Sequence, residues 1–517
     1  MNGDPSPEHL PLASEREIAT KRAPEWPRYV IGVGMLAYGI LIIAAVGTAT
    51  FELVEAVPLI ALLAFASQRI ARKVSEIDGD PAMKQFVFAA FWAKMLGTMI
   101  RALVVSEIYG NRSDALDYHK WGQFFAPHFR SLDFSVVPSM SGTYFMRVVT
   151  GVVYALTGSS QMSGAVVLSF LSYLGLLLLW RAFRIAVPNG ATYRYGVLLL
   201  FLPSFLYWPS ALGKEGWAIF CLGVGSYGVA RAIDGSIPLG VLCFFAGLAG
   251  VAWMRPHVAL IMFCGVALAA AVGRSQRPGV KSSSLRLILF GTLTILGISL
   301  AASTAWFFGV SRLDQETVNE TFAQAEGRTS EAGSSFTPVT MSNPANAPLA
   351  VMTVLFRPFP FEASSPVSAA SAFEGLFIFV LTVRSMRRLR SVGRCMRRQP
   401  YIAYCLGITI TFIYAFSAFS NFGILARERC QVLPFFLALL CLPEWERENA
   451  ISIDEALKGR DAPAPEIAAE DGDPTDLYAA PTAPGPEEGA NAPASDPYRR
   501  DDYDPYERFR KTRRGEP

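Results

Sequence analysis

The 517-residue chain is 52% hydrophobic and only 17% charged, which excludes an ordinary soluble protein with a charge-rich surface. Its net charge of +3 is small, and the basic residues are scattered between hydrophobic runs instead of forming one stripe. This pattern is typical of membrane topology signals and argues against nucleic acid as a partner.

Apolar runs long enough to cross a bilayer recur along the chain and predict an all-α, polytopic integral membrane protein of about twelve transmembrane helices. Several runs are short for a straight span and could be tilted or broken. The runs cover residues 29–49, 51–70, 86–106, 162–180, 195–208, 217–229, 237–254, 258–272, 287–308, 369–383, 401–419 and 431–442.

The cations of the connecting segments predict the orientation. Lys and Arg are concentrated in alternate segments, of which the arginine-rich stretch 384–398 is the largest. Because cations near helix ends are retained in the cytoplasm, we expect both termini there, with segment 1–28 leading into the first span. The membrane domain then covers 29–443 of a protein of the cell membrane, with long outer loops at 109–160 and 309–366.

Residues 444–517 are rich in Ala, Pro, Glu and Asp, which predicts a disordered cytoplasmic tail. The tail repeats Asp-Pro-Tyr at 496–498 and 504–506 among basic residues. A purely solubilising tail and one that docks on a protein partner or a membrane both fit this composition.

The third run carries Lys94 and Arg101, which are seven residues apart and share one face of a helix. A charge placed between membrane helices is costly and usually functional. The two cations could contact a lipid phosphate, or they could pair with Glu52 and Glu55 near the outer end of the neighbouring run.

The first outer loop places Asp114 and Asp117 three residues apart beside His119, so a helix here would carry both carboxylates on one face. Such a pair could take a proton from an attacking hydroxyl, or hold a divalent cation such as Mg²⁺ or Mn²⁺. A solvated helix cap fits the same residues. Asp117 is our first choice as the catalytic residue because Tyr118 and His119 adjoin it, and Asp114 is the second.

Residues 142–158 have apolar residues at helical spacing, which predicts a helix lying in the outer interface or an ordinary packed helix of that face. The remaining outer turns are dense in charge for so apolar a chain. Arginine forks and a lysine on one surface suit a phosphate or pyrophosphate. The candidate substrate-binding residues are His119, Lys214, Glu215, Arg255, His257, Arg357, Glu362, Arg427 and Arg429.

Taken in order, the stretches 113–119, 142–145, 202–215, 255–257, 356–362 and 421–429 resemble the polytopic membrane glycosyltransferases of the GT-C superfamily. They are similar also to an actinobacterial branch of membrane proteins associated with polysaccharide synthesis. The resemblance implies that an acidic residue of the first outer loop is the catalytic base or a metal-site residue. It also implies a polyprenyl-phosphate-linked sugar donor, a glycan acceptor, and basic residues that bind the lipid phosphate.

In that superfamily the acidic loop follows the first helix, whereas here it follows the third predicted span. Either two helices precede the shared core, or the closer relation is to polymerases of the O-antigen type, whose sites are dominated by arginines. We therefore expect a membrane glycosyltransferase or polysaccharide polymerase of cell-envelope or exopolysaccharide synthesis. The alternatives are a transporter or flippase of lipid-linked oligosaccharide, with charges along a path through the bilayer, and a non-catalytic envelope scaffold.

Overall fold

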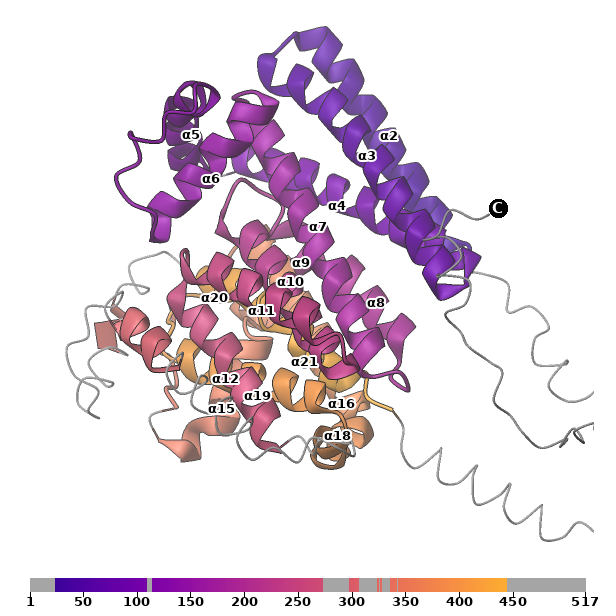
Figure 1. Ribbon diagram of the computed structural model, residues 1–517, viewed down its shortest axis with the longest axis vertical. Coiled ribbons are helices and arrows are strands. Elements are labelled where there is room, and N and C mark those ends of the chain that lie inside the picture. The colour runs from indigo at the N-terminus through magenta and orange to yellow at the C-terminus, as the bar shows by residue number, and fades with distance from the viewer. Residues whose placement is uncertain are drawn as a thin grey trace, which may run out of the picture. The chain divides into compact units, whose positions relative to one another are not determined.

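The computed structural model describes residues 24–108, 114–272, 297–305, 323–324, 326–327, 335–341 and 343–443, and regular structure there is helical apart from one isolated β-bridge between Ser335 and Asn421 (Figure 1). The all-α prediction is confirmed for this part of the chain. The helices are α2 (Trp26–Thr48), α3 (Phe51–Asp78), α4 (Pro81–Glu107), α5 (Asp114–Arg130), α6 (Gly142–Thr157), α7 (Gln161–Ala186), α8 (Thr192–Phe201), α9 (Pro203–Tyr207), α10 (Lys214–Asp234), α11 (Ile237–Ala252), α12 (Pro256–Val272), η1 (Pro344–Asn346), α15 (Ala347–Phe356), η2 (Pro360–Glu362), α16 (Pro366–Arg384), α17 (Met386–Arg390), α18 (Val392–Arg398), α19 (Pro400–Phe416), α20 (Phe422–Arg429) and α21 (Leu433–Leu440).

Six helices within the described ranges, α2, α3, α4, α7, α10 and α16, are long and apolar enough to cross a membrane. Shorter apolar helices cover Ile237–Ala252, Pro256–Val272, Pro344–Phe356 and Pro400–Phe416. The chain is therefore an α-helical membrane protein, and the figure of about twelve spans stays a prediction. The predicted disordered tail and most of the predicted span 287–308 lie outside the described residues.

Two predicted segments differ from the structure. The run 195–208 is two helices, because α8 ends at Phe201 and Pro203 opens α9. Proline has no N–H to donate and disfavours the helical conformation in the residue before it, so Leu202 is extended. The predicted outer loop 309–366 is also not loop throughout, since it contains α15, whose residues 353–356 are buried.

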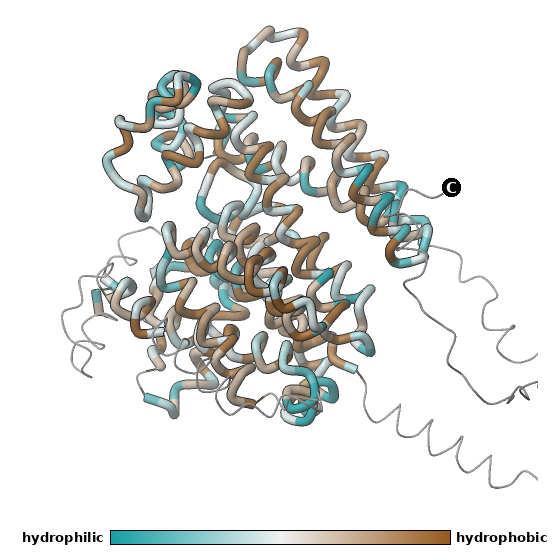
Figure 2. Tube along the Cα trace, viewed as in Figure 1, coloured by the Kyte–Doolittle hydropathy of each residue, from teal (hydrophilic) through white to brown (hydrophobic). Residues whose placement is uncertain are grey.

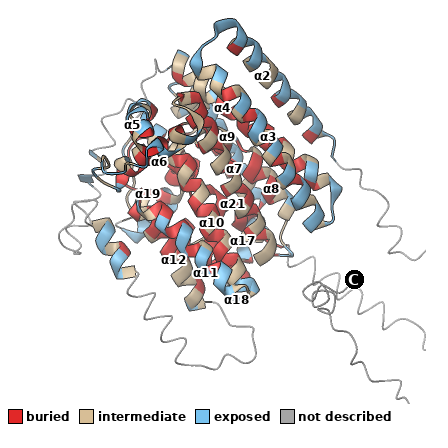
Figure 3. Ribbon diagram, turned by 45° about the horizontal axis from the view of Figure 1, so that its top comes forward, coloured by how far each residue is buried: buried red, intermediate tan, exposed pale blue. Residues whose placement is uncertain are grey.

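The bundle is held by close helix contacts at small residues. A Cβ added at Gly223 of α10 would lie 2.2 Å from the carbonyl oxygen of Gly175 on α7, so only glycine permits this crossing. Most residues of α7, α10, α19 and α21 are buried, whereas α2 is exposed over most of its length (Figure 3). The exposed apolar surface of α2 and α3 is what a lipid-facing pair requires.

The short helix α9 is braced at both ends by buried charges. Lys94 of α4 donates from Nζ to the carbonyl oxygen of Phe205 at 2.6 Å, and Glu374 of α16 accepts from the amide of Ser204 at 2.8 Å. The Lys94 cation contacts a backbone carbonyl of α9, and the Glu374 carboxylate contacts a backbone amide at its start. Each charge is therefore stabilised by the opposite partial charge of the backbone group that it contacts. Lys94 is 1% exposed and forms no ion pair with Glu52 or Glu55 among the described residues, so that predicted pairing is wrong for Lys94, while its predicted contact with a lipid phosphate stays a prediction.

Candidate functional site

A cavity of about 510 Å³ lies where the first turns of α3, α5, α7 and α10 meet the last turns of α4. The connection between α9 and α10, from Trp208 to Gly213, completes its wall. Its wall is mixed, with apolar residues such as Val105, Met162 and Leu212 beside charged ones. The charged residues that line it are Glu52, Arg101, Asp114, Lys214, Glu215 and Arg427.

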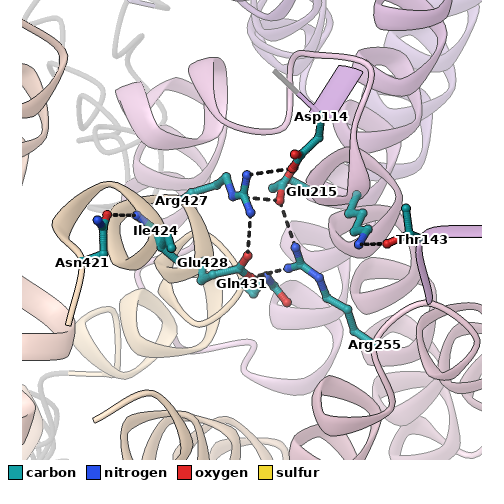
Figure 4. Close-up of polar contacts among 10 residues, drawn as sticks. Asp114, Thr143, Glu215, Arg255, Asn421, Ile424, Arg427, Glu428 and Gln431 are labelled. Atoms are coloured by element: carbon teal, nitrogen blue, oxygen red, sulfur yellow. Dashed lines mark hydrogen bonds and ion pairs between the residues drawn. The ribbon is translucent and has the colours of Figure 1, made fainter. Parts of the chain in front are cut away.

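Arg427 is the centre of the charge network (Figure 4). Its guanidinium nitrogens lie 3.5 Å from Asp114 Oδ2, 3.3 Å from Glu215 Oε1 and 3.6 Å from Glu428 Oε1. The Glu215 carboxylate is the main cause that raises the pKa of Arg427, although burial opposes it. Asp114 is the most loosely held of the three acids, because its side chain is 69% exposed against 10% for Glu215 and 7% for Glu428.

Arg255 lies behind this network and joins two of the same acids (Figure 4). Its Nη2 donates to Glu215 Oε1 at 3.0 Å and its Nη1 donates to Glu428 Oε2. Gln431 also donates to Glu428. The Arg255 side chain is 8% exposed, so the planar fork neutralises two buried carboxylates at once. It does not line the cavity.

Local helix geometry fixes these positions. The side chain of Asn421 caps α20 by accepting a hydrogen bond from the amide of Ile424 at 3.1 Å. The helix therefore begins at Phe422, which sets the direction of the Arg427 and Glu428 side chains. Glu215 lies in the first turn of α10, where an acid is favoured by the positive end of the helix.

Two cations of the cavity have no carboxylate partner among the described residues. The guanidinium of Arg101 lies 4.4 Å from the Tyr207 ring centroid and 5.0 Å from that of Trp208, contacts that hold a cation without neutralising it. Lys214 donates from Nζ to Thr143 Oγ1 of α6 at 3.0 Å. These two side chains are the ones free to neutralise an anion in the cavity.

The apolar wall of the cavity continues onto a lipid-facing surface. On α4, Leu103 lines the cavity and is 62% exposed, and Ile100 beside Arg101 is 46% exposed. On α3, Leu53 lines the cavity while Val54 is 49% exposed. Both helices belong to the membrane-spanning set, so the cavity has an apolar border next to its charged interior.

The two predicted catalytic aspartates have different surroundings. Asp114 lines the cavity, whereas Asp117 does not and is bound through both oxygens by Arg147 of α6, at 2.8 and 2.9 Å. His119 is also outside the cavity wall and lies 2.7 Å from the hydroxyl of Tyr154. Helical spacing predicted that both acids share one face of a helix. In the structure Asp114 pairs with Arg427 of α20, whereas Asp117 pairs with Arg147 of α6.

Four other candidate residues are placed away from the cavity wall. Arg357 pairs with Glu362 and lies over the rings of Phe336 and Phe422. Partial burial opposes ionisation of Glu362, but hydrogen bonds from Arg357 and a backbone amide hold its pKa below the usual value. Arg429 is fully buried and donates to two backbone carbonyls, and His257 lies in the first turn of α12. A substrate role for these four residues stays a prediction.

Three residues of this region were not among the candidates. Glu428 belongs to the charged turn 425–429, but the spacing of residues along the sequence could not predict that it pairs with Arg255. Glu374 interrupts an apolar run of α16, which is a signal for a buried functional or bracing acid. Tyr118 lines the cavity, and burial, with the nearby Asp114 charge, raises its pKa so that it is a neutral hydroxyl donor.

No group of three or more His, Cys, Asp or Glu side chains that could hold a metal ion occurs among the described residues. Comparison with known proteins gives no match to any family model, curated protein or solved structure.

Proposed function

We propose that the protein is a membrane glycosyltransferase or polysaccharide polymerase that uses a polyprenyl-phosphate-linked sugar at the outer face of the membrane. The supporting observation is the composition of the cavity. An apolar, lipid-bordered wall on α4 lies beside two cations, Arg101 and Lys214, that have no acid partner in the described part of the chain. An amphiphile with a phosphate head and an apolar tail has the matching chemistry. The tail would lie along Leu103, and the phosphate would lie near Arg101 and Lys214.

Asp114 is the better candidate for the base. An acceptor hydroxyl oxygen attacks the anomeric carbon of the sugar, and its proton passes to the Asp114 carboxylate. The bond from that carbon to the phosphate oxygen breaks, and the lipid phosphate leaves with the electron pair. Arg101 and Lys214 would stabilise the charge that develops on this leaving group. Asp117 is less suited because Arg147 already occupies both of its oxygens.

The test uses full-length protein in nanodiscs and compares Asp114→Asn with Asp117→Asn as a matched pair. An amide cannot take the proton, so Asp114→Asn should lower transfer by at least about a hundredfold while Asp117→Asn changes it little. Binding of undecaprenyl phosphate should persist in both variants and weaken in Arg101→Gln and Lys214→Gln. If Arg101→Gln and Lys214→Gln bound the lipid phosphate as tightly as wild type, the cavity would not be its site.

A further inference from the structure

At the membrane face opposite the cavity, a dense group of arginines follows the end of α16. Seven arginines occur between residues 384 and 398, and no acidic residue occurs between Glu374 and Glu428. They form the end of α16 and the two short helices α17 and α18. Figure 2 shows hydrophilic residues gathered at this end of the bundle.

The opposite position follows from the contacts at the two ends of α7 and at the start of α8. Glu52 accepts from the amide of Met162 in the first turn of α7, which places that end of α7 beside the cavity. At the other end of α7, Arg181 and Arg184 pair with Asp78. The chain then enters α8, whose Arg194 donates to Ser385 Oγ at 2.7 Å, so α16 ends at that same face.

The short helices are joined to the bundle by hydrogen bonds and by buried side chains. Ser391 Oγ donates to the carbonyl oxygen of Arg388 at 2.6 Å and closes α17, and Arg388 Nη1 donates to the carbonyl oxygen of Leu442 at 2.6 Å. Ser385, Ser391 and Cys395 are buried, so they form the inner side of this segment. Of the helices packed against this side, α12, α19 and α21 contain no acidic residue, and α16 contains Glu374, which is buried and accepts from the amide of Ser204.

The outer side is basic and lacks counter-charges. Arg387, Arg390, Arg394 and Arg397 are exposed, and none has a carboxylate partner among the described residues. Several other cations of this face do have a carboxylate partner. Lys73 pairs with Glu76, Arg231 pairs with Asp234, and the two arginines of α7 pair with Asp78.

We infer that the exposed side of α17 and α18 is a binding surface for the headgroups of anionic phospholipids. It directly follows a membrane-spanning helix, so its arginines lie at the depth of the lipid phosphates. The guanidinium fork suits a phosphate, and because no described carboxylate pairs with these four arginines, their positive charge is left to the lipid. Such cations also direct insertion, but that role ends once the protein has folded, whereas headgroup binding persists.

The experiment measures lipid binding to the purified full-length protein by native mass spectrometry, with dioleoylphosphatidylglycerol and dioleoylphosphatidylcholine as probes. Wild type should bind the anionic lipid more tightly than the zwitterionic one. Replacing Arg387, Arg390, Arg394 and Arg397 together by glutamine should reduce this preference about fivefold for each arginine that contacts a headgroup. The fourfold lysine variant should keep most of it. Lys120→Gln, an exposed cation of α5, should leave it unchanged.

The inference would be overturned if the glutamine variant preferred the anionic lipid as strongly as wild type does. It would also be overturned if wild type bound the two lipids equally tightly. If the fourfold variant failed to insert, the pair Arg394→Gln and Arg397→Gln would decide, because α18 is separated from the end of α16 by α17. Insertion would be checked by cysteine labelling at position 115. A loss of preference in Lys120→Gln equal to that of the arginine variants would show a general charge effect and also overturn it.

Discussion

Replacing Arg255 by methionine should destabilise the protein far more than the loss of one hydrogen-bonded side chain. Arg255 is 8% exposed and neutralises Glu215 and Glu428, which are 10% and 7% exposed. Methionine fills a similar volume but leaves Arg427, at 3.3 and 3.6 Å, as the one cation paired with these carboxylates among the described residues. Removing one partner of a buried ion pair costs about 3–5 kcal/mol, and we expect a loss in that range.

The assay is unfolding in mixed micelles by titration with sodium dodecyl sulfate, monitored by tryptophan fluorescence. The matched control is Arg147→Met, because its partner Asp117 is 42% exposed and a pair that reaches solvent contributes about 1 kcal/mol or less. Adding Glu428→Gln to Arg255→Met should restore part of the stability, since one buried charge is then absent. An Arg255→Met variant no less stable than Arg147→Met would refute the structural role and favour Arg255 as a substrate ligand.

Two further predictions concern single contacts. Gly97→Ala should cost about 1–3 kcal/mol because its Cβ would lie 2.1 Å from the carbonyl oxygen of Leu206, whereas Gly39→Ala, with nothing within 4 Å, should be neutral or slightly stabilising in the same unfolding assay. Burial lowers the pKa of His119 from 6.5, so the folded state prefers the neutral ring that contacts Tyr154. Stability should therefore be level above about pH 6.5 and fall as the pH decreases below it, and His119→Asn should remove this slope in unfolding curves measured at several pH values.

Hydropathy was sufficient to predict the position of the long helices. The predicted span 29–49 corresponds to α2, and 162–180 lies within α7, because a segment in lipid must be both apolar and internally hydrogen-bonded. Pro203 in the run 195–208 already signalled the break between α8 and α9. The buried helix α15 was missed because its ten residues are too few to span a bilayer.

The site was predicted only in part, because its contacts are distant in sequence. Asp114 meets Arg427 across 313 positions, while Asp117 meets Arg147 on the adjacent helix α6, and neither pairing has a local signal. Helical spacing alone therefore favoured neither aspartate. The position of Arg101 beside the rings of Tyr207 and Trp208 likewise depends on how α4 packs against α9, and this tertiary contact has no local signal in the sequence.

Under the proposed function, the geometry of α20 links binding of the donor phosphate to release of the base. Arg427, Glu428 and Arg429 are consecutive, and a rotation of about 100° per residue sends them to the cavity, the buried network and the backbone carbonyls of the α15 end. Of these three consecutive residues, only Arg427 lines the cavity, where it joins Arg101 and Lys214, and three carboxylates already surround it. An incoming phosphate would displace the weakest of them, Asp114, which is 3.5 Å away and mostly exposed. In the proposed mechanism, binding of the donor phosphate would then also free the Asp114 carboxylate, which that mechanism assigns as the base.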